Sequence, residues 1–306
     1  MRTFLNHLPI PIGCVALGFT GLATLFAPVH RVSLYIFLTV AFLLLIPVIL
    51  KLVMIRGCLS IKTDDITMST LSGSSMAMML AAAPLHTMAG WRWPIWLWAA
   101  GMTLHIVIIL LFSIRLLHSR GETPTVRGCW LLVYVGIVAA SISAPAFSFR
   151  GIGRILLYPA ALGAVILLPL VYRDDRKLPT PQKPFFCIST APVSIWLVAL
   201  LSIYPDANKT LVAALLILSQ LLYIPALVRF ALLRRLAFSP AFASFTFPFV
   251  ISATAFRKAA AFLALPVWLK LFQTAEMIIA LALCCFVLWK YLCFLFSGQK
   301  TAAVRK

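Results

Sequence analysis

The residues with the clearest chemical potential lie between positions 238 and 254, in a segment rich in phenylalanine and small side chains. Positions 238–249 read Phe-Ser-Pro-Ala-Phe-Ala-Ser-Phe-Thr-Phe-Pro-Phe. At about 3.6 residues per helical turn, one face of this segment carries Ala243, Ser244, Phe247, Ile251 and Thr254. That face is small and partly polar, with one large ring just before a proline. Such a ring can close a pore by steric block or dewetting, although periodicity alone favours an ordinary core phenylalanine.

Composition places these residues in a membrane. The chain has 306 residues, of which 63% are hydrophobic and 11% are charged. A soluble domain of this length needs more charge to cover its surface. Apolar runs of about 18 residues or more recur along the sequence, and each is long enough to cross the hydrocarbon core as a helix. The sequence therefore predicts an all-α integral membrane protein with a single transmembrane domain over residues 1–306, embedded in a lipid bilayer.

Hydropathy predicts ten transmembrane helices, joined as five helical hairpins by short turns on one side and longer basic loops on the other. The first span could pass for a signal peptide, but its glycines and the nine later spans favour a retained helix. The predicted spans are 8–28, 33–55, 67–89, 94–117, 127–148, 152–172, 184–204, 209–235, 240–262 and 266–296.

The basic residues predict the orientation of the chain. Lys and Arg number 26 against 7 Asp and Glu, for a formal net charge of +19. The loops after the second, fourth, sixth and eighth spans hold thirteen of them and the terminal segments hold five, whereas the opposite side holds seven. By the positive-inside rule, both termini face the cytoplasm, and we expect a bacterial inner membrane. The cations flank apolar helices rather than forming an aromatic-rich patch, so nucleic acid is not an expected partner.

Small and hydroxylated residues concentrate in the odd-numbered spans, and the even-numbered spans are richer in Leu, Ile and Val. A close-packing interface explains small residues in lipid. Prolines inside odd spans favour instead bent helices around a cavity. We therefore predict an inner ring of odd helices around a central pore and an outer ring of even helices. The predicted helix kinks are Pro84, Pro145, Pro192 and Pro248. The pore-lining candidates are Gly18, Gly21, Ser74, Ser141, Ser194, Ser244, Ile251 and Thr254.

Two short motifs carry a family resemblance. Residues 244–248 (Ser-Phe-Thr-Phe-Pro), which follow Phe-Ser-Pro, resemble the helix-9 signature of the tellurite-resistance/dicarboxylate transporter family, which includes the slow anion channels of plant guard cells. Residues 17–21 (Leu-Gly-Phe-Thr-Gly) look like the glycine motif in the first helix of that family. The resemblance implies a homotrimer with one pore per protomer, lined by odd helices, and it implies that Phe247 is the gate.

Two positions depart from the family pattern. Gly13-Cys14 stands where the family often has an aromatic residue followed by glycine, which bears on the width of the pore at the first helix. Ala243 replaces a family aromatic residue and loosens the expected packing behind Phe247.

Other polar residues in the spans have structural interpretations. We expect Glu276 to make a structural or subunit contact, His105 to be an interior hydrogen-bonded histidine, and His86 to lie near the outer mouth. The acid pairs 64–65 and 174–175 are interpreted as loop residues in contact with nearby arginines. Seven cysteines without metal-ligand spacing are interpreted as small apolar residues. No phosphate-binding loop or nucleophile motif is present in the sequence, so neither an enzyme, a metal nor a cofactor is expected.

Two transport functions remain as hypotheses. The first is a channel for small inorganic or organic anions, because no odd span contains a carboxylate and basic residues flank both mouths. The alternative is a secondary transporter or exporter of dicarboxylate, sulfite or tellurite-type oxyanions. Such carriers hold a dianion with cations or interrupted helices near the midplane, and the sequence places no Lys or Arg in the middle of an odd span. A membrane scaffold without transport is the residual possibility.

Overall fold

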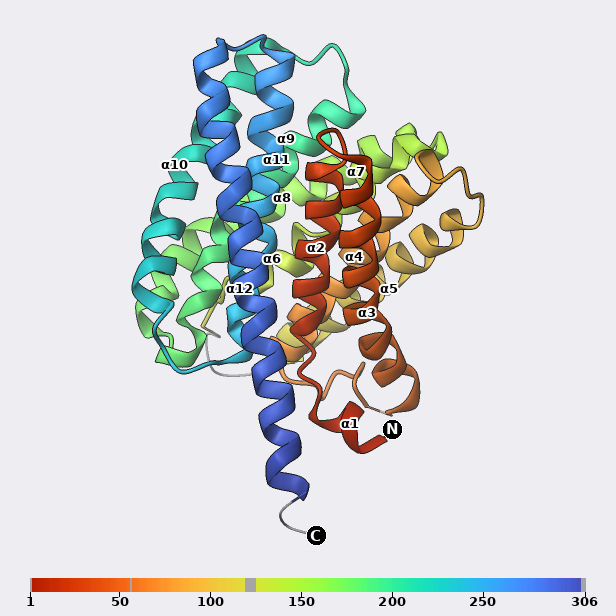
Figure 1. Ribbon diagram of the computed structural model, residues 1–306, viewed down its shortest axis with the longest axis vertical. Coiled ribbons are helices and arrows are strands. Elements are labelled where there is room, and N and C mark those ends of the chain that lie inside the picture. Colours follow the sequence, from red (N-terminus) through yellow and green to blue (C-terminus); the bar gives the residue numbers. More distant parts are fainter. Residues whose placement is uncertain (1, 56, 119–124, 304–306) are drawn as a thin grey trace.

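The computed structural model describes residues 2–55, 57–118 and 125–303, with side chains for 4–55, 57–118 and 125–296. Within these residues, regular secondary structure is entirely helical (Figure 1). The α-helices are α1 (Arg2–His7), α2 (Ile12–Phe26), α3 (Arg31–Met54), α4 (Asp65–Thr87), α5 (Pro94–His118), α6 (Trp130–Tyr134), α7 (Val138–Ser143), α8 (Arg150–Asp174), α9 (Ala191–Ile203), α10 (Lys209–Leu233), α11 (Phe247–Phe262) and α12 (Lys270–Ala303). The 3₁₀-helices are η1 (Ala144–Phe147), η2 (Asp175–Lys177), η3 (Thr180–Thr190), η4 (Pro240–Phe245) and η5 (Val267–Leu269).

Polar caps and glycine turns fix where several helices begin and end. The Asp64 carboxylate accepts a hydrogen bond from the Thr67 N–H at 2.9 Å and starts α4. Asn208 starts α10 in the same way, by accepting from the Leu211 N–H at 3.1 Å. Gly90 adopts φ +74° in the turn between α4 and α5, a conformation that glycine reaches without a Cβ clash. These local signals set where α4 and α10 begin and where the chain turns between α4 and α5.

Seven helices of the described chain are long and apolar enough to cross a membrane, in agreement with the predicted all-α membrane protein. Two of them are largely interior, with 83% of their most apolar stretch buried, and the other five have 22–28% buried. The interior pair is Asp65–Thr87 and Thr180–Ile203. The exposed five are Arg31–Met54, Pro94–His118, Arg150–Lys177, Lys209–Leu233 and Val267–Phe296.

The other three predicted spans, 8–28, 127–148 and 240–262, hold shorter or divided helices. In 8–28, α2 has only 15 residues and follows a turn at Ile10 and Pro11. In 127–148, a turn at 135–137 separates α6 from α7. In 240–262, η4 gives way to the 16-residue α11. The sequence predicted ten continuous spans because hydropathy registers apolar length and does not register a break in backbone hydrogen bonding.

The segments with small residues pack against one another in a cyclic order. Helix α2 contacts α4, α4 contacts α7, α7 contacts α9, α9 contacts α11, and α11 contacts α2 again. Figure 1 shows the N- and C-terminal segments at the same end of the molecule, which we call the terminal end. The turns that follow α2, α4, α9 and α11 therefore lie at the opposite end, which we call the far end.

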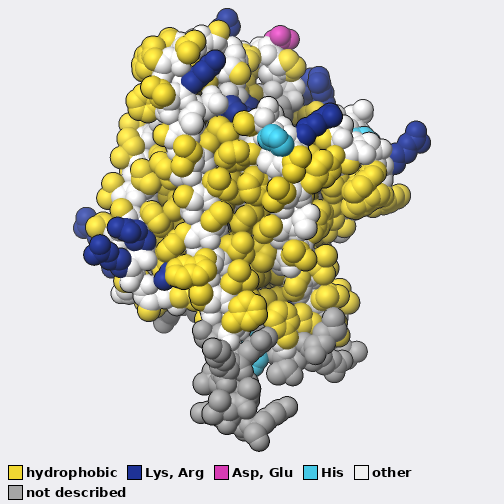
Figure 2. Space-filling model, viewed as in Figure 1, with side chains coloured by type: hydrophobic (Ala, Val, Ile, Leu, Met, Phe, Trp, Pro, Cys, Tyr) yellow, Lys and Arg dark blue, Asp and Glu magenta, His cyan; other side chains and the backbone are white. Residues whose placement is uncertain are grey.

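The surface is largely hydrophobic across the middle of the molecule. Figure 2 shows this apolar band on one face, with Lys and Arg side chains mostly toward the upper end and the lower left edge. The large exposed side chains include Leu43 of α3, Leu162 of α8 and Leu271 of α12, which are 66%, 61% and 76% exposed. An apolar belt of this kind suits contact with lipid rather than with water.

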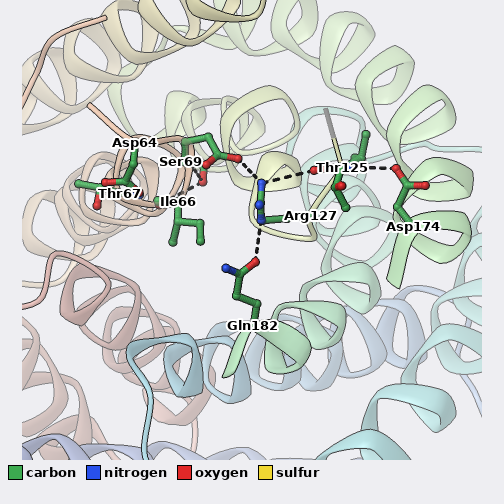
Figure 3. A network of polar contacts seen from close by, with 10 residues as sticks. Asp64, Ile66, Thr67, Ser69, Thr125, Arg127, Asp174 and Gln182 are labelled. Carbon is green, nitrogen blue, oxygen red and sulfur yellow. Dashed lines mark hydrogen bonds and ion pairs between the residues drawn. The ribbon is translucent and has the colours of Figure 1, made fainter. Parts of the chain in front are cut away.

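A polar network ties segments together at the terminal end (Figure 3). Arg127, just before α6, donates to the Asp65 carboxylate at the start of α4 and, from Nε at 2.8 Å, to Oε1 of Gln182 in η3. Asp175 is paired with Arg229 of α10. The predicted contact of these acids with arginines is confirmed for Asp65, Asp174 and Asp175, and Asp64 is a helix cap. The prediction that they are loop residues is wrong for the three paired acids, which lie in α4, α8 and η2.

Asp174 is the most buried acid of this network, with a side chain only 1% exposed. Its carboxylate lies 2.9 Å from Nε of Arg173 and 2.8 Å from Nζ of Lys177, and it accepts the Val126 N–H at 3.0 Å. It thereby joins the end of α8 to the segment that leads into α6.

Replacing this carboxylate tests the network. Asp174→Ala should lower the free energy of unfolding by about 2 kcal/mol, because the Val126 N–H loses its buried acceptor and two cations lose their partner. The apparent melting temperature of the purified protein in detergent is the measurement. The matched control is Asp206→Ala, an exposed acid in the far-end turn between α9 and α10, which should leave the melting temperature unchanged. Equal effects of the two substitutions would contradict the stabilising role.

Candidate functional site

A cavity of about 130 Å³ lies among the interior segments, and we call it the central cavity. Each of α2, α4, α7, α9 and α11 contributes to its wall, so it lies inside their cycle of contacts. None of the described residues that line it is acidic. Its lining residues are Gly21, Thr24, Leu80, Ala83, Pro84, Ile142, Ser143, Val198, Phe247, Ile251, Thr254, Arg257 and Lys258.

The Phe247 ring forms a wall of two cavities. It lines the central cavity, and it also lines a smaller apolar void of about 10 Å³. The residues around this void belong to α4, α6, η3, α9 and the turn after α6, and they include Leu131 and Ile188 from nearer the terminal end. Phe247 is 2% exposed. One benzyl ring thus lies between an open space toward the far end and a nearly filled space toward the terminal end.

The backbone around Thr246 explains why the ring is held there. Thr246 has φ −105° and ψ −91°, which is neither an α nor a 3₁₀ conformation, so η4 ends before it and α11 begins after it. Its hydroxyl lies 2.7 Å from the Ala243 carbonyl and 3.2 Å from the Cys14 carbonyl of α2. A proline follows Phe247 in the first turn, where a missing N–H costs little. The interruption therefore places Phe247 at the first position of a helix that begins inside the protein.

Two glycines of α2 let it pack closely against this helix start. A Cβ built on Gly18 would lie 2.7 Å from Cβ of Thr246, and one built on Gly21 would lie 2.7 Å from Cγ1 of Val250. Both distances are shorter than real Cβ contacts. The Cβ built on Gly21 would also lie 3.5 Å from the ring atom Cδ2 of Phe247. The glycines predicted as pore-lining thus set the distance between α2 and the Phe247 ring, and Gly21 also lines the central cavity.

The remaining pore-lining candidates divide into two groups. Ile251 and Thr254 line the central cavity, as does the predicted kink residue Pro84. The predicted serines are buried, and the hydroxyls of Ser74 and Ser141 have no hydrogen-bond partner among the described residues. Ser194 of α9 bonds to Ser252 of α11 at 3.0 Å. Of the described residues that line the two cavities, none belongs to the group Gly18, Ser74, Ser141, Ser194 and Ser244.

The four predicted kink prolines occupy different positions. Pro84 lies inside the continuous helix α4, and Pro145 lies in η1 near the far end. Pro192 and Pro248 lie in the first turns of α9 and α11, each directly after a 3₁₀ segment. At those two prolines the chain changes from one helix type to another rather than bending within one α-helix. A proline in a first turn lacks only an N–H that has no intrahelical partner there.

Two cations in the central cavity were not predicted from the sequence. Arg257 and Lys258 line its wall from α11, although charge counting had assigned both to the outer side of the membrane. A usable signal was present in the sequence. Positions 247, 251, 254 and 258 follow the spacing of one helix face, so the face that carries Phe247 continues to Lys258.

The other polar residues have structural partners or lie elsewhere. His105 is fully buried, with Nδ1 2.7 Å from the Ser75 hydroxyl and Nε2 3.0 Å from the Val133 carbonyl. This confirms an interior hydrogen-bonded histidine. His86 bonds to the Trp91 carbonyl at 2.8 Å in the far-end turn. Glu276 is buried in α12, at 6% exposure.

The cysteines are all free, and they are only partly as predicted. Cys14, Cys129, Cys187 and Cys284 are buried, whereas Cys285 and Cys293 are exposed on α12. Among the residues that the structure describes, no group of three or more His, Cys, Asp or Glu side chains is arranged to hold a metal ion.

Comparison with known proteins leaves this geometry as the basis for assigning a function. A scan against protein-family models and a search of curated proteins found no match to the chain.

The close approach of α2 to the start of α11 gives a test by substitution. Gly18→Ala should lower the free energy of unfolding by about 1–3 kcal/mol, because its Cβ must displace Thr246. The measurement is the melting temperature in detergent. Gly151→Ala is the matched control, since a Cβ there meets no atom within 4 Å in the first turn of α8. A Gly18→Ala variant as stable as the Gly151→Ala variant would show that this contact does not constrain the helices.

Proposed function

We propose that this protein carries small anions across a membrane along a path through the interior segments, and that Phe247 closes this path at rest. The observation that supports the proposal best is the Phe247 ring between the central cavity and the void beyond it. The largely apolar wall of this cavity includes two cations and three hydroxyl-bearing residues, and no acidic side chain in its described part repels an anion. Transport rather than catalysis is the class of function that this wall suits.

The proposal includes an inner ring of five segments and an outer ring of five helices. The cyclic contacts of α2, α4, α7, α9 and α11 support the inner ring, and the low burial of α3, α5, α8, α10 and α12 supports the outer one. In lipid, a divided helix is tolerated where neighbouring segments cover its free backbone groups. In the proposed inner ring, α6 with α7 and η4 with α11 are divided helices of this kind, and neighbouring segments cover their free backbone groups.

The length of the divided segment η4 with α11 is compatible with a membrane crossing. Six residues of η4 at about 2.0 Å and sixteen of α11 at about 1.5 Å span about 36 Å, and the hydrocarbon core is about 30 Å thick. The proposal further places both termini in the cytoplasm of a bacterial cell. It includes membership of the tellurite-resistance/dicarboxylate transporter family, with one path in each protomer of a homotrimer, on the strength of the two motifs.

Shortening the Phe247 side chain tests the gate. Phe247→Ala should raise chloride and nitrate flux several-fold in liposomes that contain the purified protein, because the two cavities would then join. The measurement is anion efflux under a fixed gradient, normalised to the amount of folded protein.

The matched control is Phe249→Ala. Phe249 is fully buried two residues further along the same helix, and its ring packs edge-on against Tyr223 at 5.5 Å, away from both cavities. Its truncation removes the same atoms without joining the cavities, so flux should stay at the wild-type level. Equal flux in the wild type and in a normally folded Phe247→Ala variant would contradict the assignment of Phe247 as the gate.

A coupled transporter is the second candidate, and one observation favours it. Arg257 and Lys258 bring two cations into the cavity wall, which is the feature that the sequence had failed to reveal in an odd span. A carrier should show saturable uptake of malate or sulfite that follows an imposed proton gradient. A channel should show flux that follows only voltage and the anion gradient, so the two candidates are separated by collapsing the proton gradient with an ionophore.

A further inference from the structure

A groove at the far end, separate from the central cavity, contains charged side chains that neither the gate nor the family motifs use. Its volume is about 560 Å³, and its walls come from the starts of α8 and α10. Helix α9 contacts both of these helices, and its end forms the floor. Arg150 and Arg154 of α8 line this space together with Asp206, which lies in the turn between α9 and α10. We call it the α8–α10 groove.

Helix packing and capping hold the walls of the α8–α10 groove in place. A Cβ built on Gly153 would lie 2.5 Å from Cδ1 of Ile203, so glycine lets the start of α8 approach the end of α9 closely. One turn further along α8, the Leu157 carbonyl accepts a hydrogen bond from the Trp196 indole of α9 at 2.9 Å. On the other side, the Asn208 side chain caps α10. The groove is therefore a built feature of the fold.

The two arginines are unfavourably placed for α8 itself. They lie four residues apart on one helix, a spacing that brings like charges together. They also lie in its first two turns, where a positive charge opposes the helix dipole, and the first turn of α8 contains no acidic residue. Within the part of the chain that the structure describes, neither guanidinium forms an ion pair or donates a hydrogen bond to a protein group. An anionic group held between Arg150 and Arg154 would offset both repulsions.

Arginine at a membrane interface often extends into water and needs no ligand. Two observations favour a bound group here. The Arg154 guanidinium lies over the Tyr204 ring, 5.4 Å from its centroid, which fixes the plane of its N–H donors. Next to the groove, Ile155 and Tyr158 of α8 and Leu211 of α10 expose large side chains to the surroundings. Such a surface suits acyl chains, so we expect the anionic group to belong to a lipid.

Asp206 restricts the class of headgroup. It is exposed in the same groove, and no ion pair joins it to either arginine among the described side chains. An anionic headgroup without a cation would match the arginines but would add a negative charge close to Asp206. A headgroup with a phosphate and a primary ammonium matches both signs, because guanidinium donors suit phosphate oxygens and ammonium N–H donors suit a carboxylate. A quaternary ammonium has no N–H to donate.

We propose that the α8–α10 groove binds an aminophospholipid of the phosphatidylethanolamine type from the leaflet at the far end. Its phosphate contacts Arg150 and Arg154, its ammonium contacts Asp206, and its acyl chains lie along the exposed surfaces of α8 and α10. The volume of about 560 Å³ falls in the range of about 300–1,000 Å³ that is usual for small-molecule sites. The inference requires a protein in a membrane, which the long apolar helices indicate, and it does not depend on Phe247 or on an anion path.

Native mass spectrometry of the full chain in detergent tests the site. The probes are phosphatidylethanolamine, phosphatidylcholine and phosphatidylglycerol with identical acyl chains. Wild type should bind phosphatidylethanolamine at least about threefold more tightly than the other two. Arg150→Gln and Arg154→Gln should each weaken this binding about threefold to tenfold, because each removes one charge-assisted contact at a partly exposed site. Asp206→Asn should weaken binding of phosphatidylethanolamine and leave binding of phosphatidylglycerol undiminished, a change of preference that a purely structural role would not produce.

Arg31→Gln is the matched control. Arg31 is the exposed first residue of α3, as Arg150 is of α8, and it lies outside the described wall of the groove. This variant should bind phosphatidylethanolamine as wild type does. All four substitutions replace exposed side chains, so melting temperatures in detergent without added phospholipid should stay at the wild-type value. That measurement separates lost recognition from lost folding.

Several results would overturn the proposal. Equal binding of the three lipids, or an Asp206→Asn variant with the wild-type preference, would contradict the choice of headgroup. Wild-type affinity for phosphatidylethanolamine in both arginine variants would contradict the site. Inorganic phosphate that displaces the lipid at equal concentration would show that the groove holds a free anion. Arginine variants that change the number of subunits in the same spectra, without a change in lipid binding, would show a contact between copies of this chain.

Discussion

In the hydrocarbon of a membrane, every backbone N–H and C=O must find its partner within the protein, and the rest of this structure depends on that constraint. A continuous α-helix satisfies it alone, so α3, α5, α8, α10 and α12 can leave most of their apolar surface exposed. A divided segment cannot satisfy this constraint alone, because the backbone groups at the break need partners from neighbouring segments. The breaks at 135–137 and at Thr246 lie in segments whose residues are almost all buried, and the Thr246 hydroxyl is bonded to carbonyls of η4 and α2. Interruption and burial thus occur together.

The interruption also produces the candidate site. Because α11 begins at Phe247, the ring is attached to the first residue of a helix whose start is held against Gly18 and Gly21 of α2. A close backbone approach leaves this helix start little room to move as a whole. In the proposed gate, rotation of the benzyl side chain would join the two cavities without movement of a loop or a domain, which suits a position in the middle of packed helices.

Charge is distributed unevenly along the molecule. At the terminal end, Asp65, Asp174 and Asp175 are each paired with Arg or Lys, and these are the ion pairs of the described chain. Toward the far end, Arg257 and Lys258 have only neutral acceptors, in a cavity wall of low polarity. Ion pairs stabilise the terminal end. Toward the far end, the two cations without an acidic partner create a positive potential that attracts anions.

The sequence by itself determined the all-helical class with helices that suit a membrane, and the shared face of Phe247, Ile251 and Thr254, because apolar length and helical spacing are local properties. The interior histidine at 105 was also predictable, since a lone histidine in an apolar span must find partners. Only the tertiary structure decided that the spans around Pro192 and Pro248 begin as 3₁₀ segments, that Gly18 packs against Thr246, and that Arg257 and Lys258 line the same cavity as Phe247. Those facts depend on which residues meet across α2, α9 and α11. Contacts between positions more than two hundred residues apart leave no trace in the hydropathy of either segment.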